Sequence, residues 1–166
     1  ATQNGQSTSG TVNVVSSTTS YSLTLSFVSS TLNSNSWATI RSVSDKGQGA
    51  NYWSVGDRKA VTLNGTVGSL SLSNFTTYAF ILGFNHNASY EGSNRIHFQL
   101  AKTAVSGGTD VALCDSSYNS TGSSAAFRMN TTNTNAGGWN GSYMKKTICP
   151  AFENVVPSDL RSNLKT

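Results

Sequence analysis

The order of apolar and polar residues along the chain predicts an antiparallel β-structure. In several segments apolar side chains alternate with polar ones at a period of two, which is typical of strands with one buried face. The segments with this strand pattern are 11–15, 21–27, 59–67, 70–72, 78–84, 96–100 and 110–114. Residues 144–149 are predicted to return to the sheet. The dipeptide Asn64-Gly65 suits a type I′ hairpin turn, which needs a positive φ at both central residues.

A different spacing predicts a short helix near residues 34–46. Trp37, Ile40 and Val43 recur at i, i+3 and i+6, which places them on one face of a helix. Ser and Asn residues precede them as candidate caps, and Lys46-Gly47 follows as a stop signal. We interpret Trp37 as an anchor of the hydrophobic core, because its large ring is most simply buried against the sheet.

A second helix is predicted from about residue 157, with Ser158 as its cap. Residues 130–141 show little periodicity and are expected to form an ordered loop. These patterns together predict an α+β fold made mainly of antiparallel β-sheet with two short helices. Residues 1–31 are expected to be a lead-in and a β-hairpin, and residues 32–166 the main domain.

The composition agrees with a packed domain that has few charges. Charged residues make up 11% of the 166 residues, against roughly 25% in an average soluble domain. The 10% aromatic and 36% hydrophobic residues are enough for a packed interior. The net charge of +4 reflects the scarcity of acidic residues. The basic residues form no stripe, so no nucleic-acid partner is expected. No apolar run approaches the roughly 18 residues of a membrane span, and no membrane insertion is expected.

The two cysteines, Cys114 and Cys149, allow two interpretations. A disulfide between them would stabilise the fold by about 3–4 kcal/mol in the chain-entropy model. Alternatively, both are small buried thiols. Their spacing to the two histidines of the chain does not match a zinc-ligand pattern, and no metal or other cofactor is expected.

Few residues have a spacing typical of catalysis. The chain has seven acidic residues and no paired-acid or nucleophile-elbow motif. The remaining enzymatic hypothesis is a small hydrolase in which His86 is the general base and Glu91 orients it. His97 lies within a predicted strand and is interpreted as structural. Because acid–base catalysis needs positioned titratable groups, a non-enzymatic role is favoured.

Two loops combine amide, hydroxyl and aromatic side chains, a mixture typical of recognition loops. The candidates in the first loop are Asn85, His86, Asn87, Tyr90, Glu91, Asn94 and Arg95. The candidates in the second loop are Asn133, Asn135, Trp139, Asn140 and Tyr143. Neutral amides and flat rings would suit a sugar or a protein surface. The alternative is that Asn and Gly are present for turns with positive φ and that Trp139 covers the core.

Several motifs resemble a known family. They are 51–57 (NYWSVGD), 83–87 (GFNHN), 91–98 (EGSNRIHF), 133–139 (NTNAGGW) and 157–161 (PSDLR). They are similar to a family without assigned function that occurs in phage and prophage structural proteins and in surface proteins of gut Firmicutes. The resemblance covers roughly residues 32–166. It implies a C-type-lectin-like architecture and a preceding immunoglobulin-like domain, of which residues 11–27 would be the end. It supplies no catalytic residues.

The sequence therefore predicts a non-enzymatic binding or adhesion module. It would be displayed on a phage virion, as a tail or capsid decoration, or on a bacterial surface, and would be found on the virion or outside the cell. Its expected partner is a cell-surface glycan or protein. The alternative is a purely structural virion protein that contacts neighbouring subunits.

Overall fold

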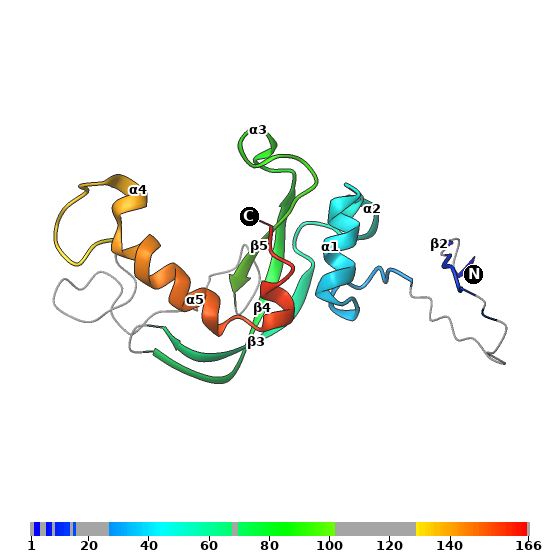
Figure 1. The fold of residues 1–166 in the computed structure, drawn as a ribbon, viewed down its shortest axis with the longest axis horizontal. Coiled ribbons are helices and arrows are strands. Elements are labelled where there is room, and N and C mark those ends of the chain that lie inside the picture. The colour runs from blue at the N-terminus through cyan, green and yellow to red at the C-terminus, as the bar shows by residue number, and fades with distance from the viewer. Residues whose placement is uncertain are drawn as a thin grey trace.

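The computed structural model describes residues 2–3, 6–7, 9–13, 15, 27–67, 70–101 and 129–165. Within them the fold is mixed α+β, with a three-stranded antiparallel sheet and several short helices (Figure 1). The predicted fold class is confirmed at this level. Strands β1 (Thr2–Gln3) and β2 (Gln6–Ser7) form a separate two-stranded sheet.

Two of the predicted strands, 21–27 and 110–114, lie almost or wholly outside the described residues. A third, 11–15, is wrong. Residues 11–13 and 15 belong to no strand, because in this segment the alternating pattern is not matched by a partner strand among the described residues. Of the segment 21–27, only Phe27 is described, and it lies outside a strand. The segment 110–114 is not described, and the predicted domain boundary after residue 31 stays a prediction.

The main sheet has the strand order β3-β4-β5, with β3 (Arg58–Val67), β4 (Leu70–Phe84) and β5 (Ile96–Ala101). The two apolar segments predicted at 70–72 and 78–84 are therefore parts of one strand of 15 residues. Polar residues between them stay in the strand because its ladder to β3 continues through them.

The predicted turn at Asn64-Gly65 is wrong, because both residues lie inside β3. The register between β3 and β4 shifts there, and Asn74 on β4 has a positive φ of 47°. The backbone N–H of Asn74 donates to Asn64 Oδ1 at 2.7 Å. A β-bulge uses Asn and Gly for the same conformational reason as a hairpin turn, so the sequence signal does not separate the two.

The first predicted helix is confirmed as α1 (Trp37–Asp45). Ser36 caps it, since its Oγ accepts a hydrogen bond from the backbone N–H of Thr39 at 3.0 Å. Gly47, with φ of 67°, ends it as the stop signal predicted. A 3₁₀ turn, η1 (Leu32–Ser34), precedes α1, and the single turn α2 (Gly49–Tyr52) follows it.

The C-terminal part is more helical than the sequence pattern predicts. It contains α4 (Gly138–Gly141), the π-helical turn η2 (Met144–Ile148), α5 (Cys149–Val155) and α6 (Ser158–Arg161). The predicted return of residues 144–149 to the sheet is wrong. Ile148 and Val155, seven residues apart, are both buried, which is a helical and not a strand spacing. The predicted second helix is the single turn α6, with Pro157 and not Ser158 at the cap position.

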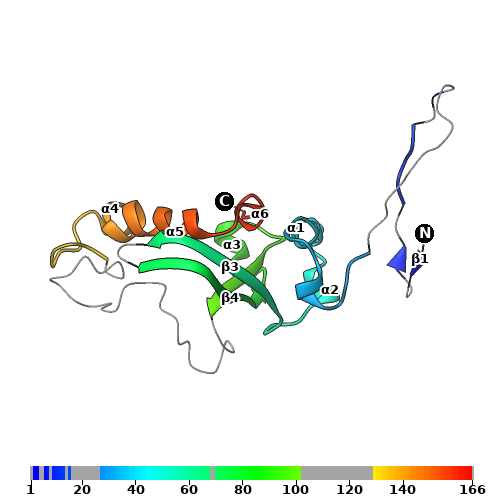
Figure 2. The same cartoon turned by 90° about the horizontal axis from the view of Figure 1, so that it is seen from below.

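One face of the main sheet carries the core. Figure 2 shows α5 and α6 along one face of β3 and β4. The side chains of Val61, Leu63 and Ile81 are at most 2% exposed beneath this cover. Trp37 is buried as predicted, and its ring meets that of Phe98 on β5 edge to face with centroids 5.7 Å apart. No described helix is long and apolar enough to cross a bilayer.

Neighbouring residues of β4 give a matched test of this core. Ile81 is fully buried, whereas Leu82 is 42% exposed. We expect Ile81→Ala to lower the free energy of unfolding by about 2–5 kcal/mol, because it leaves a cavity under the helices. Leu82→Ala is expected to change it by about 0.5 kcal/mol or less. Urea unfolding followed by tryptophan fluorescence measures both, and equal effects would contradict the assigned core face.

Candidate functional site

The loop between β4 and β5, residues 85–95, is closed at its base by Asn85 and Arg95. The backbone N–H of Asn85 donates to the carbonyl of Arg95 at 2.9 Å. In return, the backbone N–H of Arg95 donates to Asn85 Oδ1 at 3.0 Å. Asn85 has a φ of 54°, which Asn tolerates better than most residues. This pair fixes the direction in which the loop leaves the sheet.

A second attachment joins the loop to α1 through Asn94. Its Nδ2 donates to the carbonyl of Asp45 at 3.0 Å, and its own carbonyl accepts from Ser44 Oγ at 2.7 Å. Asn94 also has a positive φ, of 62°. Because Ser44 is 5% exposed, this attachment reaches into the body of the molecule. The loop is therefore held at its base and at its side.

Glu91 organises the tip of the loop. It ends the single helical turn α3 (Ala88–Glu91), and its Oε2 lies 2.9 Å from Nε2 of His97 on β5. Asn87 Nδ2 donates to Glu91 Oε1 at 3.3 Å, and Arg95 Nε donates to the Glu91 carbonyl at 2.5 Å. The pKa of Glu91 is held below its ordinary value. The hydrogen bond from His97 is the largest cause, and the hydrogen bond from Asn87 is the next.

The structure pairs Glu91 with a different histidine from the one predicted. The hydrolase hypothesis had Glu91 orient His86, but the carboxylate is bonded to His97. The ring of His86 lies beside that of His97, with centroids 5.9 Å apart. The register shift at Leu82 on β4 changes which residues of β5 face the loop, and residue spacing alone does not reveal it.

His97 is held in one orientation by this pairing. Its Nδ1 atom is buried and has no hydrogen-bond partner among the described residues. A proton there would be a buried unpaired donor, so the neutral ring fits best with its proton on Nε2, directed at Glu91. The interpretation of His97 as a structural residue agrees with this geometry.

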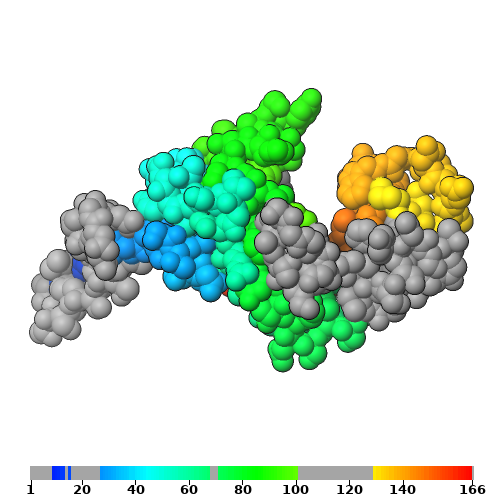
Figure 3. All heavy atoms as spheres, turned by 180° about the vertical axis from the view of Figure 1, so that it is seen from behind, coloured from blue at the N-terminus to red at the C-terminus, as the bar shows by residue number. Residues whose placement is uncertain are grey.

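Tyr90 is the residue that the loop displays. Its side chain is 91% exposed at the end of the loop that contains α3. Figure 3 shows this green segment as a spur that projects from the surface. Of the seven first-loop candidates, only His86 and Tyr90 have side chains that make no hydrogen bond within the described residues, and both are exposed. The structure thus separates residues that build the loop from those that it presents.

The second candidate loop lies apart from the first. α4 lies at one end of the molecule in both ribbon views, away from α3 (Figures 1 and 2). Trp139 is 51% exposed, so the alternative that it covers the core is wrong. Tyr143 packs partly against the core, and Asn140 Oδ1 accepts a hydrogen bond from Lys145 Nζ. Asn133 and Asn135 are exposed. The two predicted sets of residues therefore do not form one site.

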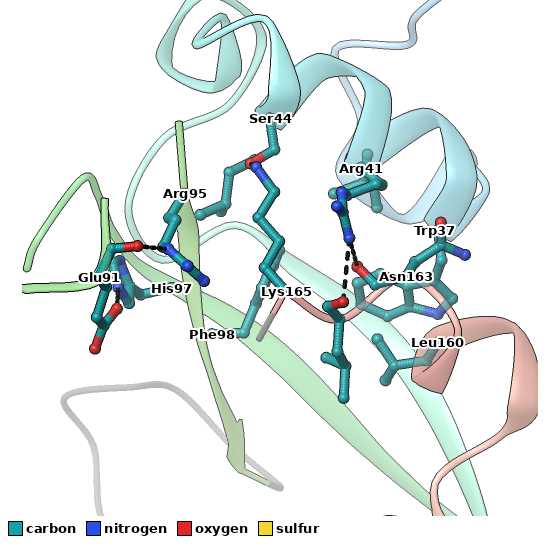
Figure 4. A pocket seen from close by; sticks show the side chains of 13 residues that line it. Trp37, Arg41, Ser44, Glu91, Arg95, His97, Phe98, Leu160, Asn163 and Lys165 are labelled. Atoms are coloured by element: carbon teal, nitrogen blue, oxygen red, sulfur yellow. Dashed lines mark hydrogen bonds and ion pairs between the residues drawn. The ribbon is translucent and has the colours of Figure 1, made fainter. Parts of the chain in front are cut away.

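A cavity of about 250 Å³ lies beside the first loop (Figure 4). Trp37 and Ile40 of α1, Phe98 of β5 and Leu160 of α6 form its apolar part. Glu91, Arg95 and His97 stand at its loop side. The cavity thus joins an apolar floor to the polar base of the displayed loop, a combination typical of small binding pockets.

Charged side chains hold the segment after α6 beside this cavity through hydrogen bonds and ion pairs. Asp45 accepts from Arg41 at 3.0 Å and lies 2.9 Å from Lys165 Nζ. Hydrogen bonds from Lys165, the larger cause, and from Arg41 lower the pKa of Asp45 below its ordinary value. Arg41 also donates to the carbonyls of Asn163 and Leu164, at 3.3 and 3.1 Å. These bonds shape the wall of the cavity opposite β5.

Sequence reasoning did not find most residues of this cavity. It placed Trp37 in the core but did not single out Arg41, Ser44, Phe98 or Lys165 as neighbours of the first loop. Arg41 follows Trp37 by one helical turn, which is the one signal that could have indicated it. Lys165 carries no local signal, because its position depends on the path of the chain after α6.

Comparison with protein-family models, with curated proteins and with solved structures finds no match for this chain. The resemblance to phage and Firmicutes surface proteins therefore stays a prediction. No group of three or more His, Cys, Asp or Glu within the described segments is placed to hold a metal ion. Cys149 is exposed at the start of α5, and Cys114 lies outside the described residues, so the predicted disulfide stays a prediction.

The pairing of Glu91 can be tested by its titration. In the wild type we expect a Glu91 pKa below the ordinary 4.5, because the hydrogen bond from His97 stabilises the carboxylate. The stability that this pair adds is present above pH 4.5 and is lost as the pH falls through the lowered pKa. ¹³C NMR titration of the Glu91 carboxyl should show its pKa return toward 4.5 in His97→Phe. His86→Phe is the matched control and should leave the Glu91 pKa lowered. If His86→Phe raised the pKa and His97→Phe did not, the partner of Glu91 would be His86 and not His97.

Proposed function

We propose that this chain is a non-enzymatic binding module that recognises a cell-surface glycan or protein through the 85–95 loop. The observation that carries the proposal is Tyr90, 91% exposed at the tip of a loop whose base and side are fixed by hydrogen bonds. A large exposed ring makes few contacts within its own chain. It can therefore bury apolar surface against a partner without giving up internal packing. A loop that is already ordered also pays little conformational entropy when it binds.

The neighbouring cavity gives the proposed site its second part. A ligand that contacts Tyr90 can extend along Glu91 and Arg95 toward the apolar floor at Trp37 and Phe98. Glu91 and His97 serve in this proposal as a hydrogen-bonded support of the loop. Their pairing gives the loop its shape and does not require a reaction step.

The setting of the proposed function follows from the family resemblance. We propose display on a phage virion or a bacterial surface, with a C-type-lectin-like architecture for the unit to which the chain belongs. A surface poor in charge supports this proposal in part, because amide and hydroxyl groups bind neutral partners without the cost of desolvating ions.

Trp139 favours a second candidate, a structural role in contact with neighbouring subunits. Its ring is 51% exposed in α4, which lies apart from α3, the turn that contains Tyr90. An aromatic side chain on a separate face can join subunits while the 85–95 loop stays accessible. The two roles therefore predict different effects for the two aromatic residues.

Binding of labelled protein to intact gut Firmicutes cells and to an array of bacterial surface glycans tests the proposal. Tyr90→Ala should weaken binding roughly 30-fold, the equivalent of about 2 kcal/mol for an interface hot spot. Tyr90→Phe should retain most of the binding, since it keeps the ring. Trp139→Ala is the matched control and should bind as the wild type does.

Three results would decide against the recognition role of the loop. They are unchanged binding by Tyr90→Ala, an equal loss in Trp139→Ala, and no signal for the wild type on any cell or glycan. Light scattering that shows self-assembly of the wild type but not of Trp139→Ala would favour the structural role.

A further inference from the structure

A second and larger groove, of about 750 Å³, lies away from the 85–95 loop. Its lining comes from η1 and the residues before it, from the start of β3 and from the middle of β4. Arg58 pairs with Phe80, and Ala60 with Tyr78, so these side chains share one face of the sheet. That face is opposite to the one that holds Val61 and the core.

The accessible lining of this groove is mainly polar. Leu32 and Phe80 lie at its base but are only 2% and 3% exposed, so they offer a ligand little surface. Ser30, Thr31 and Asn33 stand at the rim with exposed side chains. Neutral hydrogen-bonding groups at the rim suit the hydroxyl groups of a sugar.

Arg58 is the charged group best placed to select a ligand. Its guanidinium carbon lies 4.5 Å from the centre of the Tyr78 ring and 5.9 Å from that of Phe80. Within the described parts of the chain, this guanidinium makes no hydrogen bond or ion pair. Stacking on Tyr78 keeps the planar fork in place while its N–H donors stay free, which is the arrangement that binds carboxylates with two parallel hydrogen bonds.

Asp57 is beside Arg58 in the groove but does not neutralise it. Its Oδ2 accepts from the backbone N–H of Ser54 at 2.9 Å, and no ion pair with Arg58 is formed. A groove with one free guanidinium and one carboxylate favours a ligand with a single negative charge over a doubly charged phosphate. Asp57 can accept hydrogen bonds from hydroxyl groups of the same ligand.

An extended peptide fits this edge of the sheet less well. A peptide that adds to β3 needs the outward backbone N–H groups of that strand. At the groove, the N–H of Ala60 already donates to Asn33 Oδ1 at 2.9 Å. Lys59 Nζ donates to the carbonyl of Asn33 at 3.2 Å and adds to this closure. The edge is therefore covered where the groove begins.

We propose that this groove binds a saccharide that carries a carboxylate. Arg58 holds the carboxylate, and Asp57 and Asn33 hydrogen-bond to the ring hydroxyls. The site is separate from the 85–95 loop, so it does not depend on the function proposed for Tyr90. It adds selectivity for acidic glycans to a surface whose other rim groups are neutral.

Isothermal titration with short oligosaccharides tests the proposal. The probes are oligomers that contain galacturonate, glucuronate or N-acetylneuraminate, each beside its neutral counterpart. We expect the full chain to bind at least one acidic oligomer at least tenfold more tightly than the neutral one. Arg58→Gln should remove that preference, and Arg58→Lys should keep only part of it, because the ammonium lacks the planar fork.

Two control variants make the result specific. Lys46→Gln removes the same charge from an exposed residue that does not line the groove, and it should bind as the wild type does. Tyr90→Ala should keep the preference for acidic over neutral oligomers, because Tyr90 does not line the groove, so failure of the function proposed for the loop and failure of this inference give different results. Circular dichroism melting confirms that each variant is folded.

The outcomes that would overturn the inference are concrete. Binding of no acidic oligomer up to 10 mM, equal affinity for acidic and neutral oligomers, or unchanged binding by Arg58→Gln would each reject it. Tighter binding of a sugar phosphate or of an acidic peptide than of any carboxylate sugar would assign the groove to that ligand instead.

Discussion

Burial of one face of the β3–β4–β5 sheet is the interaction on which the other elements depend. The longest described helix, α1, has nine residues, and helices shorter than about 12–15 residues are marginal alone in water. α1, α5 and α6 therefore persist because each adds apolar side chains to the same core, around Leu63 and Ile81. The loop between β4 and β5 takes its position from this sheet, since its two ends directly adjoin the strand residues Phe84 and Ile96. Loss of the core would thus remove the site as well as the fold.

Asparagine does much of the construction at the surface of this molecule. Asn74, Asn85 and Asn94 have positive φ values, and their side chains or backbone join separate segments. Asn35 is buried and bonds Ser29, whose carbonyl also accepts from the Trp53 ring. The turn interpretation of Asn is therefore correct for Asn85 and Asn94. What is left for recognition is chiefly aromatic, and this is why Tyr90 carries the proposal.

The parts of the fold that could be predicted from sequence are those fixed by local signals. α1 followed from the spacing of Trp37, Ile40 and Val43 and from its cap and stop residues. The strands of the main sheet followed from alternation. The helix at residues 144–155 was missed because its π-helical turn shifts the periodicity that a helical pattern would show.

The site could be predicted only in outline, because its contacts join distant segments. The 85–95 loop was found from its composition, but the pairing of Glu91 with His97 depends on a bulge in a different strand. The groove around Arg58 brings together residues from 30–33, 56–58 and 78–80, and no one of these segments has a binding motif. Residue spacing describes neighbours within one element, whereas these sites are made by pairing between elements.

The small number of anchoring groups at the proposed site around Tyr90 has a consequence for how such a module would act. One exposed ring beside a cavity of about 250 Å³ offers few anchors, and few anchors give modest affinity for a single copy. When several copies are linked, binding of one copy raises the effective concentration of the others at the same surface. Avidity can therefore exceed single-site affinity by about 10²–10⁴. Sites of modest affinity that are already ordered are useful when many copies face one cell surface, because single encounters stay reversible while the array holds. Repetitive display, as on a virion or a cell wall, is thus the setting in which this geometry would be effective.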